Sequence, residues 1–558
     1  MRSPARLLPL ASLCAGLLVQ TLQARQSGAA QEDVLRELEA RTRVWEQENP
    51  YSAPHWLSPD ELGRLDEVGR TFTETLPPTL APREIAEFEQ MESVLVRYPF
   101  GISTALIAAM SQELPVLTLV SGASQEATVR SQYTAAGVNL AACSFLYAST
   151  NSYWTRDYGP WFVQSGGEVA VVDFPYNRPR PLDDDIPWRV AAQLGMDCYG
   201  MNLIQTGGNW MGDGYGAAAS SELVVEENPG MSEAQMSAKT WDYLGVDRYY
   251  RLPDPNNTYI DHIDCWAKFL DVDKVLVRQV PASHAQYDEI EATAAWFAAT
   301  PSSWGRPYEV YRVWTPNNEP YTNSIILNGS VFVPVMNGSW DDEALAVYRQ
   351  AMPGYTVQGF TGSWQSTDAL HCRSKGIADR GLLHVHHVPL ADSVEAGQAL
   401  QLQLDITASS GQPLIADSLK CWHRLNGGSW SATALQPTGG RWMASLPALQ
   451  PGQTLDYLLQ AADQSGRFTQ HPYTGRFDPH RCAARSMQLD SPILSQSREG
   501  TNLRLSWNAV AGALRYRLEG ASSLAGPWEM EMETAESSVV IPLSASETRL
   551  WRVRALNP

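Results

Sequence analysis

The sequence predicts an α/β domain over residues 82–385, followed by two modules built from strands alone. From Pro82 to about Arg380, short apolar strands alternate with amphipathic stretches of helical length, a pattern typical of α/β domains. Beyond His387 the helical patterns disappear, and short strands alternate with turns rich in Gly, Pro, Ser and Asn. A chain of 558 residues also exceeds one usual domain, so we expect about three domains with separate cores.

Residues 1–24 are typical of a secretory signal peptide. Arg2 and Arg6 precede a mostly apolar run from Leu7 to Val19, which is shorter than a bilayer-spanning helix. No later apolar run approaches the ~20 residues that such a helix needs. We therefore expect an exported protein without a transmembrane segment, either secreted or retained in the periplasm or at the cell surface.

Residues 25–81 are expected to form a helical segment and a linker. Apolar residues at helical spacing predict a surface helix over 31–48. A second short helix is predicted within 58–71, because Ser58 is a favourable cap and the Pro and acidic residues that follow suit a first helical turn. Prolines between Leu76 and Pro82 then interrupt any helix and predict a linker.

The α/β domain repeats one order of elements. Strand, helix and strand follow one another at two clear places: 93–98, 102–112 and 116–120, and again 274–278, 286–300 and 308–313. A repeat length of about sixty residues leaves room for roughly five such units in the domain.

Residues 386–485 are predicted to form an immunoglobulin-like sandwich, and residues 486–558 a fibronectin type III-like module. The strands that indicate them are predicted at 399–407, 417–425 and 454–461 in the first module, and at 503–507, 515–518, 539–541 and 550–553 in the second. Cys421 and Cys482 lie in the first module and form the favoured disulfide in an oxidising compartment. Neither module offers a catalytic cluster, so we expect them to serve surface or protein partners.

The charge balance narrows the class of partner. The chain carries 61 acidic and 41 basic residues, a formal charge of -20. Such a charge argues against nucleic acid or an anionic membrane surface and suits a cationic ligand.

A histidine and a carboxylate two residues apart, His262 and Asp264, mark the first candidate site. They lie in a β-prone stretch over 258–266, and residues i and i+2 of a strand share a face. An imidazole beside a carboxylate can transfer protons and hold a cation, although an isolated pair of this kind is more often an ordinary histidine beside its partner.

Cys372 and Asp157 are the candidates that would complete this site. From the residue alone, a buried or disulfide-bonded thiol is the commoner role of a cysteine in a secreted chain. The neighbours His371, Arg373 and Lys375 favour a thiolate instead. The two aspartates can equally be ordinary salt-bridge carboxylates, with Arg156 beside Asp157 and Lys268 near Asp264.

Taken together, five motifs resemble those of the bacterial, Porphyromonas-type peptidylarginine deiminases. The resemblance runs continuously over about 85–380 and rests on W-T-R-D-Y-G-P-W at 154–161, Y-N-R-P-R-P-L-D-D-D at 176–185, Y-I-D-H-I-D at 259–264, E-P-Y-T-N-S at 319–324 and S-T-D-A-L-H-C at 366–372. It implies the fold of the guanidine-modifying superfamily, an α/β propeller of five ββαβ modules, with which the unit count agrees.

The resemblance implies a role for each candidate residue. Cys372 would be the nucleophile, His262 the general acid and then the general base, and Asp157 and Asp264 the carboxylates that grip a guanidinium, with Asn323 in a supporting role. Physical chemistry requires such a set, because a guanidinium is a cation with a poorly electrophilic carbon that carboxylates must orient for a thiolate to attack.

The resemblance also implies how the substrate is held. Trp154 and Tyr259 match residues that line the family's pocket, although such aromatic residues more often belong to a core. Arg178 and Arg180 match arginines that hold the α-carboxylate of a C-terminal arginine, whereas without the resemblance we would pair them with the acidic run 183–185. That run lacks the ligand spacing of a calcium loop and is expected to form a solvated turn, so we expect no metal site and no cofactor.

We therefore expect an exported hydrolase that converts arginine side chains of peptides or proteins to citrulline and ammonia. The nearest alternative is an agmatine deiminase, which shares the catalytic residues but takes a small free amine. The predicted signal peptide, the β-modules and the Arg178–Arg180 pair argue against it. A binding protein with an inactive propeller is a second alternative, against which the intact Cys372, His262, Asp157 and Asp264 argue. A papain-like protease would need another order of residues.

Overall fold

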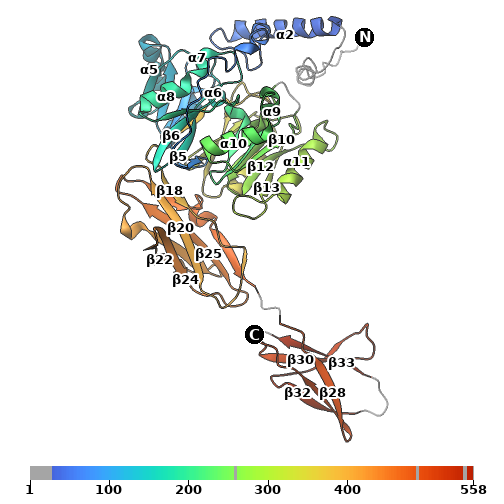
Figure 1. The fold of residues 1–558 in the computed structure, drawn as a ribbon. Helices are drawn as coiled ribbons and strands as arrows, with labels where there is room; N and C mark the ends of the chain where they lie inside the picture. The colour runs from blue at the N-terminus through green and yellow to red at the C-terminus, as the bar shows by residue number, and fades with distance from the viewer. Residues whose placement is uncertain (1–27, 257–259, 486–488, 544–548, 557–558) are drawn as a thin grey trace. The chain divides into compact units, whose positions relative to one another are not determined.

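The computed structural model describes residues 28–256, 260–485, 489–543 and 549–556, and Figure 1 shows its ribbon. The chain divides into two compact units. The first comprises residues 1–388, 404–420 and 459–479, and the second comprises residues 389–403, 421–458 and 480–558. Over the described residues, no helix combines the length and the apolar character needed to cross a membrane.

The first unit contains five small sheets of the same design. Their strand orders are β1-β5-β6-β7, β10-β9-β8, β11-β12-β13, β14-β15-β16 and β17-β2-β3-β4. Each sheet contains an antiparallel pair, and the sheet with β1 contains two. At least one further strand is then added in parallel after a helix, as parallel pairing requires a crossover. The strands are β1 Pro82–Glu84, β2 Met91–Arg97, β3 Val116–Val120, β4 Cys143–Tyr147, β5 Trp161–Ser165, β6 Glu168–Asp173, β7 Cys198–Gly200, β8 Met211–Gly212, β9 Ala217–Ser221, β10 Arg248–Leu252, β11 Ala267–Asp271, β12 Lys274–Gln279, β13 Glu309–Trp314, β14 Ile325–Leu327, β15 Ser330–Val335, β16 Thr356–Thr361 and β17 Lys375–Ala378.

The helices of this unit lie between the strands or precede them. The crossover helices join β2 to β3, β6 to β7, β9 to β10, β12 to β13 and β15 to β16. The described α-helices are α2 Gly28–Glu48, α3 Pro59–Leu62, α4 Thr104–Glu113, α5 Ala123–Ala136, α6 Thr155–Tyr158, α7 Pro181–Asp184, α8 Ile186–Leu194, α9 Leu223–Glu227, α10 Glu233–Leu244, α11 Tyr287–Ala299 and α12 Asp341–Ala351. Short 3₁₀ helices are η2 Leu65–Glu67, η3 Leu140–Ala142, η4 Gly207–Asn209 and η5 Ile263–Cys265.

The two strand–helix–strand units predicted from sequence are confirmed as β2-α4-β3 and β12-α11-β13. The strand predicted around His262 is wrong. His262 caps η5 and Asp264 lies within it, so these residues follow a tight 3₁₀ turn, and the strand begins only at Ala267. The side chains of His262 and Asp264 therefore do not share one face of a strand, as the alternation of a strand had predicted.

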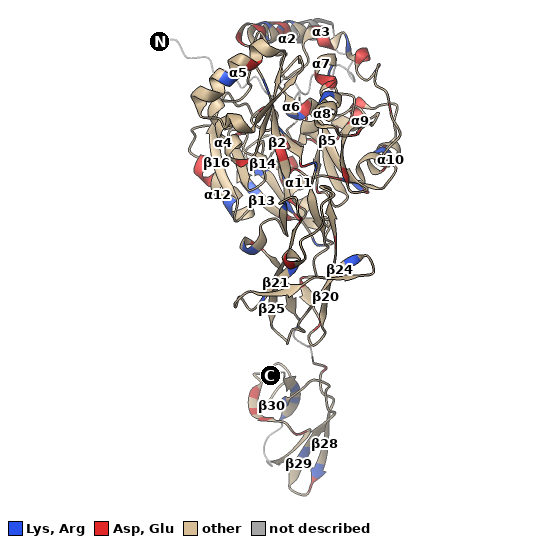
Figure 2. Cartoon of the chain, turned by 90° about the vertical axis from the view of Figure 1, so that its left-hand side faces the viewer, with Lys and Arg blue, Asp and Glu red and all other residues tan. Residues whose placement is uncertain are grey.

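The N-terminal helices are also present. In α3, the side chain of Ser58 accepts from the backbone of Glu61 while Glu61 accepts from the backbone of Ser58, a complete capping box. The helix is shorter than predicted because it ends before Gly63. Figures 1 and 2 both show α2 on the side of the domain that carries α5 and α7, and Figure 2 shows acidic and basic residues interspersed over these elements.

Beyond Ala378 the described chain is built almost entirely from strands. These are β18 Leu383–His386, β19 Ser393–Val394, β20 Leu400–Ala408, β21 Lys420–Leu425, β22 Ser431–Ala434, β23 Gln436–Thr438, β24 Arg441–Leu446, β25 Thr454–Ala462, β26 Phe468–His471 and β27 His480–Ala484, with the 3₁₀ turns η6 Ala416–Ser418 and η7 Gly475–Phe477. The strands predicted at 399–407, 417–425 and 454–461 are confirmed as β20, β21 and β25.

The disulfide expected between Cys421 and Cys482 is not formed, and both residues are free thiols. Cys421 lies in β21 and Cys482 in β27, and β25 separates these two strands within one sheet. Strands two apart in a sheet are about 10 Å from each other, whereas a disulfide needs Cα atoms within about 7 Å. The prediction failed because belonging to one module does not place two cysteines on neighbouring strands.

The C-terminal module forms two three-stranded sheets of order β28-β29-β32 and β31-β30-β33. Its strands are β28 Leu494–Glu499, β29 Asn502–Trp507, β30 Arg515–Ala521, β31 Glu529–Thr534, β32 Ser538–Pro542 and β33 Leu550–Leu556. Leu505, Trp507, Tyr516 and Leu518 belong to its small core. Sequence analysis missed β28 and β31, whose residues are mostly polar and exposed and so lack a hydrophobic pattern.

Candidate active site

The candidate residues meet where loops and short helices of several sheets converge. Asp157 lies in α6, His262 and Asp264 lie at η5, and Cys372 lies three residues before β17. Two bonds join these segments: the backbone of Arg156 donates to the carbonyl of Cys372 at 3.2 Å, and the Oδ1 of Asn209 in η4 accepts from the backbone of Ile263 at 3.2 Å. The structure therefore brings together side chains that are up to 215 residues apart in the sequence (372 − 157).

The thiol of Cys372 is fixed by Asn323. The side-chain nitrogen of Asn323 lies 3.3 Å from Sγ, and its oxygen accepts from the backbone nitrogens of His371 at 3.0 Å and Cys372 at 3.4 Å. The Sγ also lies 3.7 Å from Oδ2 of Asp264. Asn323 thus holds the loop that carries the thiol, which goes beyond the turn role that an asparagine before a strand usually has.

The charge environment of Cys372 differs from the one expected. Burial, followed by the charges of Asp264 and Asp157, raises the pKa of the thiol well above its usual range. The expected stabilisation of a thiolate by Arg373 is offset because this guanidinium binds Asp368, with Nε 3.0 Å from Oδ1. In this state of the protein Cys372 is a protonated thiol.

His371, next to the thiol, links Asp264 to Glu87. Its Nδ1 lies 2.7 Å from Asp264 Oδ2, and its Nε2 lies 2.7 Å from Glu87 Oε2. Burial raises the pKa of Asp264, but the hydrogen bond and charge of His371 outweigh it and hold this pKa below its usual value. Glu87 also binds Arg156 at 2.8 Å and Lys268 at 2.6 Å. The two cations expected as partners of the aspartates therefore pair with Glu87, and the aspartates face imidazoles instead.

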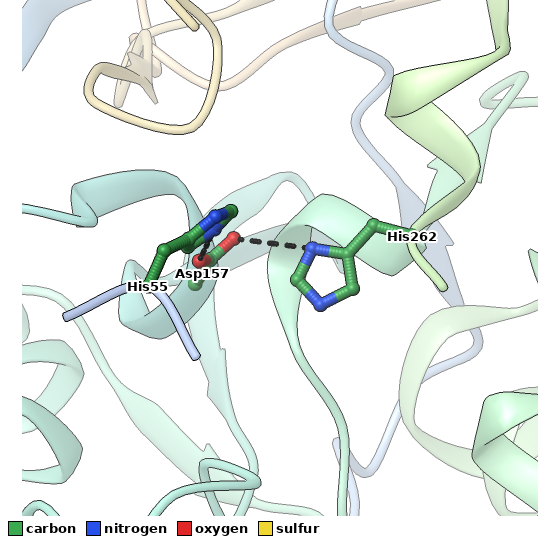
Figure 3. A group of neighbouring side chains, drawn as sticks. All are labelled: His55, Asp157 and His262. Atoms are coloured by element: carbon green, nitrogen blue, oxygen red, sulfur yellow. Dashed lines mark ion pairs between the residues drawn. The ribbon is translucent and has the colours of Figure 1, made fainter. Parts of the chain in front are cut away.

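His262 and Asp157 face each other across 3.7 Å, from Nδ1 to Oδ1, as Figure 3 shows. Burial lowers the pKa of His262 to about 4, against the opposing charges of Asp157 and Asp264. Burial likewise raises the pKa of Asp157 to about 6. Over the described residues neither ring nitrogen of His262 has a hydrogen-bond partner. The imidazole is neutral and free to exchange a proton with a ligand.

Gly208 in η4 marks the space between these groups. A Cβ built on it would lie 2.7 Å from Asp157 Oδ1, 2.7 Å from His262 Nδ1 and 3.3 Å from Asp264 Oδ2. Because Gly208 has no side chain, these three polar atoms can lie this close to its backbone, and any larger residue would push them apart. Two carboxylates and an imidazole around one small space can bind a planar cation with several N–H donors.

The structure adds a third imidazole that sequence analysis did not single out, that of His55. Its Nε2 lies 3.5 Å from Asp157 Oδ2 (Figure 3), and its ring centroid lies 4.5 Å from that of Trp154. Single ligand atoms of His55, Asp157 and His262 all lie within 4.8 Å of one another, so this set can also hold a metal ion. No sequence signal links His55 to the site, since it lies in the segment predicted to precede the domain.

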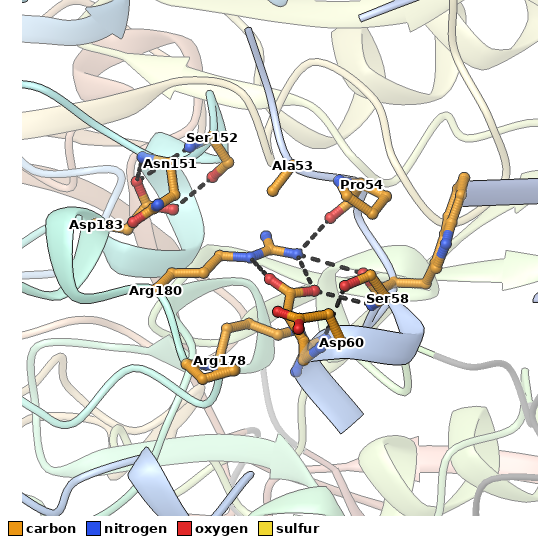
Figure 4. A network of polar contacts seen from close by, with 12 residues as sticks. Ala53, Pro54, Ser58, Asp60, Asn151, Ser152, Arg178, Arg180 and Asp183 are labelled. Carbon is orange, nitrogen blue, oxygen red and sulfur yellow. Dashed lines mark hydrogen bonds and ion pairs between the residues drawn. The ribbon is translucent and has the colours of Figure 1, made fainter. Parts of the chain in front are cut away.

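Arg178 and Arg180 are both buried, and each has its own partner. Arg180 binds Glu61 of α3, with Nε 2.6 Å from Oε1 and Nη2 3.2 Å from Oε2 (Figure 4). Arg178 donates from Nη1 to the carbonyl of Asn177 at 3.1 Å. The carboxylate bound by Arg180 therefore comes from the N-terminal segment.

Two further expectations concern neighbours of this pair. The expected solvated turn at 183–185 is wrong for Asp183, which is fully buried and accepts from the backbone nitrogens of Asn151 at 2.7 Å and Ser152 at 3.1 Å (Figure 4). These bonds give the buried carboxylate the partners that it needs. Tyr259, the other predicted pocket residue, lies outside the described residues.

Comparison with known proteins places residues 92–375 in a family model described as Porphyromonas-type peptidyl-arginine deiminase. An agmatine deiminase from Medicago truncatula is 24% identical over 40% of this chain and 75% of its own length. An agmatine deiminase from Ectopseudomonas mendocina is 25% identical over 46% of this chain and 80% of its own length. Among solved structures, the agmatine deiminase of Enterococcus faecalis aligns over 55% of this chain and all of its own, with a TM-score of 0.48 and 20% identity.

Proposed function

Because the chain belongs to the Porphyromonas-type peptidyl-arginine deiminase family, we propose that it hydrolyses the guanidinium of a C-terminal arginine in peptides or proteins to citrulline and ammonia. The family match and the named relatives make it a guanidino-group deiminase, that is, a hydrolase of amidine C–N bonds. The choice of peptidyl arginine is the proposal. It is supported by the buried Arg180, which already binds a carboxylate.

The reaction begins with a protonated thiol and a neutral imidazole. A guanidinium between Asp157 and Asp264 would bring a positive charge to the site and lower the pKa of Cys372. The thiol proton passes to His262 as Sγ forms a bond to the guanidinium carbon. The imidazolium then gives that proton to one amino group, which leaves as ammonia, and a thiouronium remains on the sulfur.

The second half of the reaction uses the same imidazole as a base. His262 takes a proton from a water molecule, whose oxygen adds to the thiouronium carbon. The C–S bond then breaks and its electron pair returns to the sulfur of Cys372, which takes the proton from the imidazolium. The added oxygen loses its remaining proton to solvent as citrulline is released. Asp264, whose carboxylate is already ionised beside His371, can hold the cation through both halves.

The observation that carries the choice of substrate is that Arg180 already binds a carboxylate. Its guanidinium holds both oxygens of Glu61 in a buried place, the geometry that suits a substrate α-carboxylate. The primary ammonium of agmatine would instead approach two buried guanidiniums, which like charge disfavours.

Agmatine is the second candidate, since the relatives named above are agmatine deiminases. Product release should therefore be compared for a peptide ending in free arginine, the same peptide with an amidated end, and agmatine. A charge-assisted contact contributes about 1.5–3 kcal/mol, so we expect the acid to react at least about tenfold faster than the amide. Equal rates for acid and amide, or a preference for agmatine, would reject C-terminal arginine as the substrate.

We further propose that the five sheets are the modules of a propeller and that the β-rich regions are immunoglobulin-like and fibronectin type III-like modules that bind surface or protein partners. The repeated sheet design supports the first proposal. The signal-like residues 1–24 support export. Mass spectrometry of the N-terminus recovered from culture medium and cell fractions would test export.

A further inference from the structure

We propose that residues 52–62, the N-terminal plug, occupy the substrate pocket of their own domain and keep the enzyme closed until the plug moves. The inference rests on the proposed function for the identity of the pocket. The plug would regulate that site, because it makes one contact at each end of the pocket.

The first contact fills the carboxylate end. Besides holding both oxygens of Glu61, Arg180 donates from Nη2 to the carbonyl of Pro54 at 2.6 Å and to that of Trp56 at 3.3 Å (Figure 4). Arg180 is only 2% exposed. A substrate carboxylate can reach this guanidinium only after Glu61 has left, so the plug and the substrate exclude each other here.

The second contact fills the catalytic end. A ring nitrogen of His55 lies within 4.8 Å of Cys372 Sγ and of an Asp368 oxygen, and its Nε2 faces Asp157 at 3.5 Å. The imidazole is planar, carries nitrogen and packs against Trp154, as an arginine guanidinium would. Cys372 is fully buried with the plug in place. The plug therefore presents both features of the proposed substrate, a flat nitrogen-bearing group and a carboxylate.

The plug is held by contacts that can be reversed. Ala53 donates to the carbonyl of Asn151 at 2.8 Å, and Arg97 donates to the carbonyl of Tyr51 just before the plug at 2.5 Å. The linker that follows is open to solvent at 79–81, and Leu80 is 60% exposed. A cut there precedes β1 and would sever the covalent link between the plug and the domain without breaking a strand, so that the plug is held by these non-covalent contacts alone.

The test uses the reactivity of Cys372 in the full chain. Iodoacetamide labelling followed by peptide mass spectrometry gives the rate at Cys372, and the partly exposed Cys143 and Cys198 serve as reference thiols in the same molecule. The variants are His55→Ala, Glu61→Gln and the double variant. Asp60→Asn is the matched control, because Asp60 lies in the same helix, is 77% exposed and pairs with Arg64.

We expect Cys372 to be protected in the wild-type chain and to react at least about tenfold faster in the Glu61→Gln and double variants, the factor expected for loss of one charge-assisted contact. Release of citrulline from a C-terminal arginine peptide should rise in parallel, and Asp60→Asn should match the wild type. A protease site placed at 79–81 and cleaved after purification should have the same effect and avoids any folding defect of the variants.

Equal labelling of Cys372 in the wild type, the variants and the cleaved chain would overturn the proposal. So would lower turnover in the variants with unchanged labelling, because the segment would then be part of the working site. If the variants and the cut expose Cys372 but neither arginine peptides nor agmatine are hydrolysed, the plug is supported and the proposed function is what fails.

Discussion

Replacing Gly208 with Ala tests whether the positions of Asp157 and His262 set the reaction rate. The new methyl group would lie 2.7 Å from Asp157 Oδ1 and 2.7 Å from His262 Nδ1, whereas ordinary contacts begin near 3.4 Å, so each atom must retreat by about 0.7 Å (3.4 − 2.7). Misplacement of reacting groups by about 1 Å can lower a rate about a hundredfold. We therefore expect kcat/KM to fall by about tenfold to a hundredfold, or about 1.4–2.7 kcal/mol.

The assay compares kcat/KM for a C-terminal arginine peptide in both the wild-type and the Glu61→Gln background, so that closure by the plug does not hide the effect. Gly230→Ala is the control, because a Cβ there meets nothing within 4 Å. Overpacking costs about 1–3 kcal/mol of stability, so the thermal midpoint should be followed by circular dichroism. If the Gly208 variant keeps the activity of the Gly230 variant, the reaction does not depend on the positions of Asp157 and His262.

Four further predictions follow from the same site. Cys372→Ala should abolish citrulline formation and keep the circular dichroism spectrum, and residual turnover would exclude a covalent route. His262→Gln should bind substrate but stall near the covalent stage, which intact mass spectrometry would detect as an adduct on Cys372. His371→Gln removes the partner that lowers the pKa of Asp264, so this pKa should rise. The acidic limb of the pH–rate profile should then move to higher pH, and an unchanged profile would contradict this role of His371. A chelator should leave turnover unchanged, and activity restored only by added metal would show that a cation is required.

The sequence predicted which residues form the site better than it predicted the backbone that positions them. Asp157, His262, Asp264, Asn323 and Cys372 were recognisable because each lies in a motif with a chemical reason for its residue types, and the structure gathers them around one space. The reason given for pairing His262 with Asp264 was nevertheless wrong, because a 3₁₀ turn replaces the predicted strand. Local propensity could not distinguish these two backbones for so short a stretch.

Other parts of the site depend on tertiary contacts that no local pattern contains. Glu87 pairs with His371, Arg156 and Lys268, which lie in three separate segments of the chain. The counter-ions of the site could therefore not be assigned from neighbours in sequence. His55 reaches the site from a segment that looked like a simple extension, because nothing in its own sequence indicates where it docks. The alternating order of strands and helices was predictable because it depends on local periodicity alone.

The pairing of β17 with β2 has a consequence for how the protein is made. β17 begins three residues after Cys372 and lies antiparallel to β2, so one sheet is assembled from the two ends of the catalytic region. During synthesis β2 must wait, without this partner, until some 280 later residues (375 − 97) have been added. A nascent chain that has not yet reached residue 378 therefore cannot pair β17 with β2, and deiminase activity would appear only after that pairing.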